Sequence, residues 1–267
     1  HAMTTISTGG FSIYNESLGK FNSYKIELVS ILFMILGSLP FVIYLKITHG
    51  DWKTIFKDEQ IKLFIYILVI LVLITTIWLK LNYNNNIIES LRLSIFNITS
   101  ILTGTGYTST NFNTWGGFGL IIMLIIMFIG GCAGSTTGGI KIFRLLLLFR
   151  GAKTQIKRLT HPHGVFMISF NNKTVGEDSF NSIMGFFFMY ILVFIFASIA
   201  LSFFNLDFIT SISAAASAIS NVGPGLGSII GPNGSYEPLP NVSKWILSIT
   251  MLIGRLELFT FLVLLSS

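Results

Sequence analysis

Charged residues are scarce in this sequence. They make up 10% of the 267 residues, whereas soluble domains carry about 25%. Long stretches contain no Asp, Glu, Lys or Arg at all, and one of them runs from residue 93 to residue 140. With 52% hydrophobic residues, this distribution excludes a soluble globular domain and a disordered chain. The single cysteine, Cys132, excludes a domain held together by internal disulfides.

Five apolar stretches are long enough to cross a bilayer as helices, which takes about 20 residues. Two shorter stretches, 89–103 and 207–220, do not reach that length, and each ends in a run that contains glycine. The pattern therefore predicts an all-α polytopic membrane protein in which the two short helices enter and leave on the same side. The five long stretches cover residues 26–45, 61–81, 117–140, 179–204 and 242–265.

Basic residues are concentrated in two linkers between the predicted spans. Residues 46–62 hold four Lys and residues 141–177 hold seven Lys or Arg, out of 17 in the chain. The positive-inside rule places both linkers in the cytoplasm and the linkers at 82–86 and 231–241 outside. The net charge of +6 is thus explained by topology, so we expect contact with membrane lipid and no nucleic-acid partner. Aromatic residues near the span ends, typical of an interfacial belt, are Trp115, Trp245, Tyr83 and Tyr236.

Three short glycine-containing runs share one pattern. Each follows a helical segment rich in small or hydroxyl residues and precedes a predicted span. Their central glycines, Gly9, Gly106 and Gly223, are 97 and then 117 residues apart, and the difference matches the unequal lengths of the two basic linkers. The repeating unit is therefore a helix, a short pore helix, a glycine turn and a second helix.

Backbone carbonyls freed at such a turn are tolerated in a membrane only where protein buries them or where they line an aqueous path. Rings of carbonyls can replace the hydration shell of a cation, and glycine adopts the backbone angles that aim them one way. Close helix packing is the other interpretation of a single run, and three matching runs favour a filter. The candidate ligands are the carbonyls of Ser7, Thr8, Gly9, Gly104, Thr105, Gly106, Asn221, Val222 and Gly223.

Five glycines in ten residues, at 130–139, interrupt the predicted span 117–140. A nucleotide-binding loop is excluded because its Lys and Ser or Thr would directly follow the last glycine, where this chain has Ile140. A membrane serine hydrolase is excluded because no histidine lies within a predicted span to act as the base. The run predicts a broken helix, with close helix packing as the alternative. No catalytic pair remains, so the sequence does not predict an enzyme.

Four further motifs occur in a fixed order along the chain: HAMTTISTGGFS at residues 1–12, GGCAGSTTGGIK at 130–141, NVGPGLG at 221–227 and GRLE at 254–257. With them the whole chain resembles the C-terminal part of the Trk/Ktr/HKT superfamily of cation uptake proteins. It is most similar to the bacterial Trk-type potassium uptake subunits.

This resemblance implies four helix, pore-helix, helix repeats around one pseudo-fourfold pore that takes up potassium across the bacterial inner membrane, with the glycine turns facing outward. It implies no cofactor besides the transported K⁺. It also implies a homodimer and a TrkA-like nucleotide-binding regulatory subunit at the cytoplasmic linkers. The run at 130–139 resembles a loop that gates the pathway beneath the filter, and the gate residues would be Gly130, Gly131, Gly134, Ser135, Thr136, Thr137, Gly138, Gly139 and Arg255.

Arg255 is a basic residue deep in the predicted span 242–265. A charge at that depth is costly unless it is paired or hydrated, so we expect it to contact Glu257 or carbonyls of the glycine-rich loop. Glu257 is only two positions away and therefore lies on another face of the helix. The resemblance assigns Arg255 to the cavity below the filter.

The predicted elements divide the chain into repeats and linkers. On this division the first repeat and the first helix of the second are absent, so we expect the chain to be a fragment. The divisions are the end of the second repeat at 1–46, a cytoplasmic linker at 47–60, the third repeat with a broken last helix at 61–147, a basic cytoplasmic linker at 148–177 and the fourth repeat at 178–267.

The residues leave three functions open: a potassium uptake pathway, a symporter coupled to Na⁺ or H⁺, and a non-conducting membrane sensor or scaffold.

Overall fold

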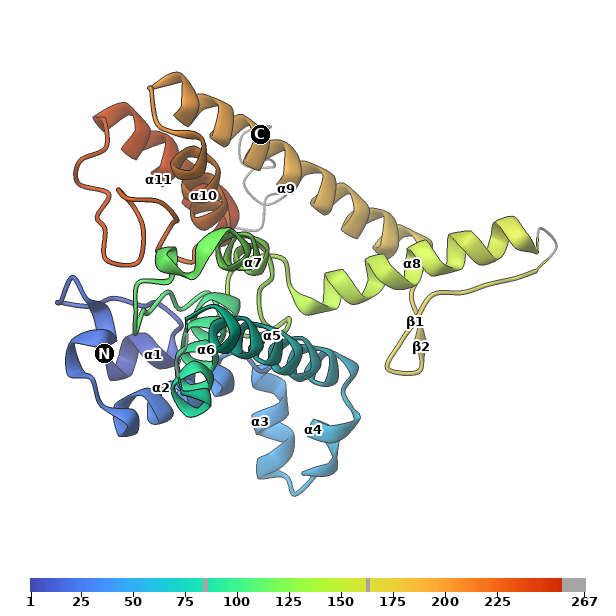
Figure 1. Ribbon diagram of the computed structural model, residues 1–267. Helices are drawn as coiled ribbons and strands as arrows, with labels where there is room; N and C mark the ends of the chain where they lie inside the picture. The colour runs from blue at the N-terminus through green and yellow to red at the C-terminus, as the bar shows by residue number, and fades with distance from the viewer. Residues whose placement is uncertain (84–85, 162–163, 256–267) are drawn as a thin grey trace.

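The computed structural model describes residues 1–83, 86–161 and 164–255, and nearly all of its regular structure is helical (Figure 1). The predicted all-α membrane class is therefore confirmed. Two short strands, β1 (Ser169–Phe170) and β2 (Lys173–Thr174), form an antiparallel hairpin after α8. The turn of this hairpin has positive φ at Asn171 and Asn172, a conformation that Asn tolerates well.

Among the described residues, a helix precedes each of the three glycine-containing runs. The first part of the chain forms α1 (Ala2–Ile6), η1 (Ser17–Phe21), α2 (Tyr24–Gly37), α3 (Phe41–Thr48) and α4 (Lys53–Lys57). The middle part forms α5 (Glu59–Tyr83), α6 (Ile87–Leu102), η2 (Phe112–Trp115), α7 (Gly116–Phe128) and α8 (Ile142–Thr160). The last part forms α9 (Glu177–Phe203), α10 (Phe208–Ser220) and α11 (Asn241–Arg255). The two short predicted helices are confirmed as α6 and α10.

Two of the described helices, α5 and α9, are long and apolar enough to span a membrane, and α2 with α3 makes a third if the bent pair counts as one span. That pair is bent by 92°. The prediction of one continuous span at 26–45 is therefore wrong. Pro40 has no N–H with which to continue a helix, so α2 ends at Gly37 and α3 starts after the proline.

The predicted span at 117–140 is also interrupted, as its glycines indicate. Helix α7 ends at Phe128, and the chain leaves the helix for the whole of 130–139 before α8 begins. Figure 1 shows α8 projecting away from the other helices, and its later turns carry the basic residues Arg150, Lys153, Lys157 and Arg158. In the last predicted span, α11 is described up to Arg255, whereas Glu257 lies outside the described residues.

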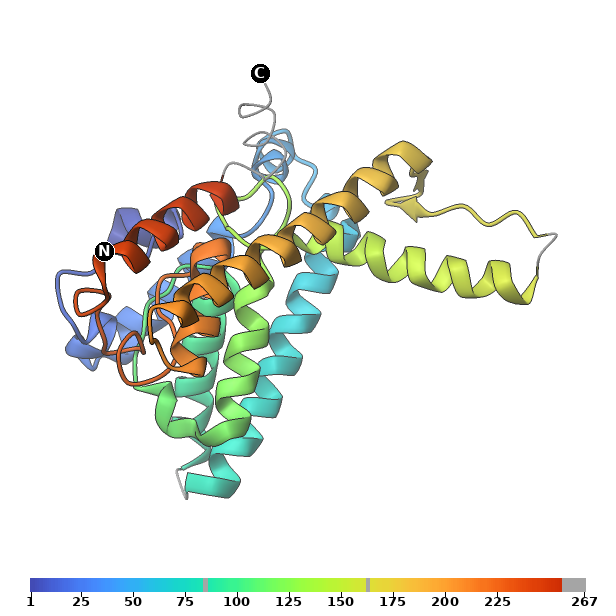
Figure 2. The ribbon, with the colours of Figure 1, turned by 90° about the horizontal axis from the view of Figure 1, so that it is seen from above.

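The buried core lies where neighbouring helices meet. Figure 2 shows α5, α6 and α7 running side by side, and their contact buries Phe64, Ile98 and Met123 completely. A second cluster joins α9, α10 and α11. Small residues allow α10 to be enclosed on all sides, since alanine side chains leave room for close neighbouring helices. The alanines of α10 with no exposed surface are Ala214, Ala215, Ala216 and Ala218.

A buried ion pair ties α6 to α2. Arg92 on α6 donates to both carboxylate oxygens of Glu27 at 2.6 and 2.7 Å, and its guanidinium lies 3.8 Å from the ring centroid of Tyr24. The side chain of Glu27 is 5% exposed and that of Arg92 is 16% exposed. Removing one member would leave the other charge buried without a partner, which is costly.

Glu27→Ala should therefore destabilise the protein by about 3–5 kcal/mol, seen as a lower melting temperature in detergent. The matched control is Glu177→Ala, because Glu177 is 89% exposed and lies 4.0 Å from Arg158. This control should change stability by less than about 0.5 kcal/mol. Equal melting temperatures for the two variants would show that the buried pair does not hold α6 in place.

Candidate cation site

The turns that follow α1, α6 and α10 have the same backbone conformation. In each turn two residues separated by one have positive φ: Thr8 and Gly10, Gly104 and Gly106, Asn221 and Gly223. In each, the amide of the residue between them donates to a carbonyl of the preceding helix. These bonds run from Gly9 to Thr4 at 2.8 Å, from Thr105 to Ser100 at 2.9 Å and from Val222 to Ser217 at 3.0 Å. We call residues 8–10, 104–106 and 221–223 the three turns.

This equivalence corrects the register that the sequence predicts for the first turn by one residue. Gly10, and not Gly9, corresponds to Gly106 and Gly223. Ser7 precedes the turn as the C-cap of α1, with φ of −76°. The sequence could not distinguish two adjacent glycines, whereas the backbone angles and the shared hydrogen bond do.

The three turns lie edge to edge. A Cβ atom added to Gly10 would lie 1.6 Å from the carbonyl oxygen of Thr105, and one added to Gly106 would lie 2.0 Å from that of Val222. Each of these glycines thus allows its turn to touch a carbonyl of the next turn, and no other residue would fit. Gly223 has no described atom within 4 Å of its Cβ position, so its side of the arrangement is open.

A cavity of about 270 Å³ lies where the turns meet. Part of its wall is backbone of the turns, from Gly9, Gly10, Thr105, Gly106, Val222 and Gly223. The structure therefore brings five of the nine predicted ligand positions, together with Gly10, into the wall of one cavity. The other four predicted positions, Ser7, Thr8, Gly104 and Asn221, are not in its wall. Backbone carbonyl oxygens at turns of this kind can replace part of the hydration shell of a cation.

The 130–139 loop lies against the opposite side of the turns. The hydroxyl of Thr8 donates to the hydroxyl oxygen of Thr136 at 3.0 Å. The Cβ position of Gly104 is 3.6 Å from the Gly138 nitrogen, and the Cβ position of Gly138 is 2.2 Å from the Ser220 carbonyl oxygen. The loop consequently contacts the first two turns and the end of the helix that leads into the third.

The bend between α2 and α3 accommodates this loop. The carbonyl of Ser38 accepts the Cys132 amide at 3.0 Å, and the carbonyl of Gly37 accepts the Thr136 amide at 3.3 Å. These carbonyls are free because Pro40 ends the helical hydrogen bonding of α2. The unexpected bend in the predicted span 26–45 therefore supplies the partners that the loop's own backbone needs inside the membrane.

Three side chains hold the loop from other elements. Arg255 donates from Nη1 to the Thr136 carbonyl at 3.0 Å, which is one of the two kinds of partner that the sequence suggests for it. Gln60 accepts the Ala133 amide at Oε1, at 2.9 Å, and is 8% exposed. The ammonium group of Lys141 donates to the carbonyl of Thr137.

Gln60 and Lys141 were not among the predicted site residues. Both fall in stretches that the sequence assigns to cytoplasmic linkers, Gln60 in 46–62 and Lys141 in 141–177, although Lys141 is also the last residue of the motif at 130–141. Gly254 also contributes to this arrangement, because its lack of a side chain allows α11 to lie close to α10. A Cβ atom added to Gly254 would lie 2.0 Å from the Ile219 carbonyl oxygen. This close approach brings α11, and with it Arg255, to the end of α10.

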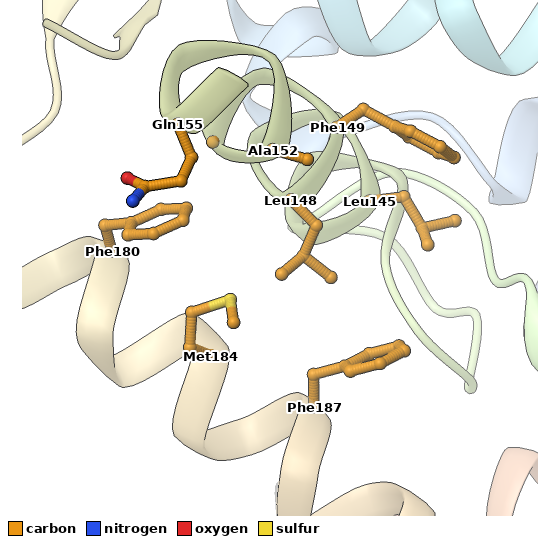
Figure 3. Close-up of a pocket in the computed structure, with 9 residues that line it drawn as sticks. Leu145, Leu148, Phe149, Ala152, Gln155, Phe180, Met184 and Phe187 are labelled. Atoms are coloured by element: carbon orange, nitrogen blue, oxygen red, sulfur yellow. The ribbon is translucent and has the colours of Figure 1, made fainter. Parts of the chain in front are cut away.

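A roomier cleft of about 630 Å³ lies between α8 and α9, away from the three turns. Figure 3 shows its walls, where Leu145 and Leu148 of α8 face Met184 and Phe187 of α9. Apart from the Gln155 amide the lining side chains are apolar, so this cleft offers a cation poor ligands compared with the cavity at the turns.

Comparisons with known proteins agree on one family. The family model described as "TrkH: Cation transport protein" matches residues 1–267. The Trk system potassium uptake protein TrkI of Halomonas elongata is 38% identical over 267 residues, covering 100% of this chain and 54% of that protein. The Trk system potassium uptake protein TrkH of Escherichia coli is 34% identical, covering 99% of this chain and 54% of that protein.

A solved structure is similar over almost the whole chain. The crystal structure of the potassium transporter TrkH from Vibrio parahaemolyticus superposes with a TM-score of 0.93 at 34% identity, covering 99% of this chain and 57% of that one. The chain thus spans about half the length of the curated relatives it matches.

Proposed function

Because this chain belongs to the TrkH family of cation transport proteins, we propose that it forms part of a potassium uptake pathway whose cation ligands are the carbonyls of the three turns. The relatives named above are potassium uptake proteins, and potassium is therefore the first ion to test. The proposed ligands are the carbonyls of residues 8–10, 104–106 and 221–223, which replace the sequence-based set by moving the first turn one residue along.

The observation that carries this proposal is the edge-to-edge contact of the turns. Three segments that are far apart in the sequence meet through backbone atoms at Gly10 and Gly106, beside one cavity. Glycine is needed there for close approach, and a purely structural helix contact would not require the same positive-φ pattern three times. The open side at Gly223 leaves room for a fourth turn to complete a ring.

The proposed gate is the 130–139 loop. Its glycines, with Ser135, Thr136 and Thr137, form a segment that can change conformation through small backbone rotations. Its contacts with Thr8 and Arg255 link it to the first turn and to α11. Arg255 also brings a fixed positive charge to the loop, and such a charge hinders the passage of cations.

The proposed setting is the bacterial inner membrane, with the three turns facing outward and the basic linkers in the cytoplasm. Exposed apolar side chains on α5 and α9, such as Leu73 and Phe196, support contact with lipid. The basic end of α8 supports a cytoplasmic partner, which we propose to be a TrkA-like nucleotide-binding regulatory subunit. A homodimer is proposed on the family resemblance alone.

Ion flux into liposomes tests this function. The protein, expressed from its complete gene, is reconstituted, and rubidium tracer uptake is measured with a membrane potential but without a Na⁺ or proton gradient. We expect uptake that K⁺ inhibits by competition. Uptake that requires a Na⁺ or proton gradient would instead show a symporter, which broken membrane helices also permit. No uptake under either condition would favour a non-conducting sensor or scaffold.

A further inference from the structure

Tyr236 lies on the loop between α10 and α11, which Figure 1 shows below α11 in orange to red. The side-chain hydroxyl of Tyr236 donates to the carbonyl oxygen of Gly223 at 2.7 Å. Tyr236 and Gly223 both line the cavity at the three turns. The sequence predicts only that this tyrosine belongs to the aromatic belt at the membrane surface, and it does not reveal the contact with Gly223.

The amide of Gly223, on the preceding peptide, donates to the Ser217 hydroxyl oxygen at 3.0 Å. The peptide that carries the Gly223 carbonyl has few other means of holding its orientation. Gly223 has φ of 108° and no described atom within 4 Å of its Cβ position, whereas the equivalent glycines in the other two turns pack against a neighbouring carbonyl. The next residue is Pro224, which has no N–H, so the peptide that carries the Gly223 carbonyl cannot be anchored through its nitrogen. The carbonyl oxygen is therefore the polar atom by which this peptide plane can be held.

The loop that carries Tyr236 is held in place independently of its hydroxyl. Asn113 of η2 and Gly227 exchange two hydrogen bonds, at 2.7 and 3.2 Å. Thr108, next to the second turn, donates to the Pro232 carbonyl at 3.3 Å. The loop is thus attached to the middle repeat, and it delivers the tyrosine to the last turn from a fixed position.

We propose that Tyr236 is a positioning residue for cation selection, which fixes the plane of the Gly223 carbonyl from the wall of the cavity at the three turns. A carbonyl oxygen has two lone pairs, so one can accept the phenol while the other faces a cation. Discrimination between K⁺ and Na⁺ depends on the number and orientation of carbonyl dipoles around the ion. Desolvation raises the pKa of Tyr236 to about 12, so the hydroxyl keeps its proton and remains a donor at physiological pH. This inference rests on the function proposed above.

The test is the ratio of K⁺ to Na⁺ flux in liposomes, measured for the complete protein with Tyr236→Phe. Loss of one neutral hydrogen bond shifts a conformational balance by roughly threefold to tenfold, and we expect the flux ratio to fall by that order. The matched control is Tyr83→Phe, which removes a hydroxyl that donates to the Thr114 carbonyl, away from the turns. This control should keep the original ratio.

Each outcome distinguishes the inference from the function on which it rests. An unchanged ratio in Tyr236→Phe, with K⁺ flux and selectivity intact in the unmodified protein, would overturn the role of Tyr236 alone. Equal falls in Tyr236→Phe and Tyr83→Phe would also overturn it, because the effect would then belong to the outer surface in general. Absence of K⁺ flux in the unmodified protein would overturn the proposed function and this inference together.

Discussion

Gly106→Ala should reduce potassium uptake by about tenfold or more. Gly106 has φ of 82°, a conformation that costs a residue with a Cβ about 1–2 kcal/mol, which alone corresponds to a change of about tenfold. The added Cβ would also lie 2.0 Å from the Val222 carbonyl oxygen, so one of the two turns must move. The measurement is rubidium uptake in liposomes at equal amounts of reconstituted protein.

Gly117→Ala is the matched control for this change. Gly117 lies in the first turn of α7, has no atom within 4 Å of its Cβ position and does not have positive φ. It should transport at the original rate, and its helix should be slightly stabilised because alanine favours helix. Normal uptake by Gly106→Ala would contradict the claim that the second and third turns must touch.

Arg255→Ala should raise cation flux by about tenfold or more when no activating partner is present. The variant loses a charged hydrogen bond to the Thr136 carbonyl, and bonds of this kind contribute about 1.5–3 kcal/mol. That free energy corresponds to roughly tenfold to a hundredfold in the population of a displaced loop. The variant also removes the positive charge that we propose hinders the passage of cations. The measurement is rubidium leak into liposomes that contain the transport protein alone.

Arg158→Ala provides the comparison, because Arg158 on α8 also donates to a carbonyl, that of Phe166, at 3.1 Å. This arginine lies in the last turn of α8, the helix that projects away from the others (Figure 1), and its loss should leave the leak unchanged. If Arg255→Ala leaks no faster than the unmodified protein, Arg255 anchors α11 without controlling the pathway.

The order of the main elements could be predicted from composition, because α6 and α10 are short apolar helices that are each followed by a glycine within three residues, Gly104 after α6 and Gly223 after α10. Such helices are recognisable locally, since length and the glycine at the end are both properties of one segment. The broken helix after Phe128 was predictable for the same reason, from five glycines in ten residues. These features needed no knowledge of distant contacts.

Features that depend on two distant segments could not be predicted. The sequence contains Pro40, yet an apolar run around a proline can also continue as a kinked span. The sharp bend is stabilised by hydrogen bonds from Cys132 and Thr136, which are about 100 positions away. Likewise, Thr8 takes φ of 50° against its intrinsic preference because tertiary contacts fix the first turn. For this reason the register of that turn was one residue off.

Gln60 illustrates the same limit at the candidate site. Its position at the start of an apolar helix is ordinary for a polar residue, and only the fold brings it to the Ala133 amide. A buried polar group normally has a hydrogen-bond partner, but that rule does not reveal which partner before the fold is known. The sequence therefore predicted that the helix is broken at 130–139, but it did not predict that Gln60 and Lys141 hold the resulting loop.

The central claim is that a cation binds among the carbonyls of the three turns. The most direct measurement is anomalous scattering from crystals of the complete protein grown or soaked with rubidium in place of potassium. We expect an anomalous peak within coordination distance of the carbonyl oxygens of residues 8–10, 104–106 and 221–223, beside the cavity at the three turns. A rubidium peak located elsewhere, with none among these carbonyls, would contradict it.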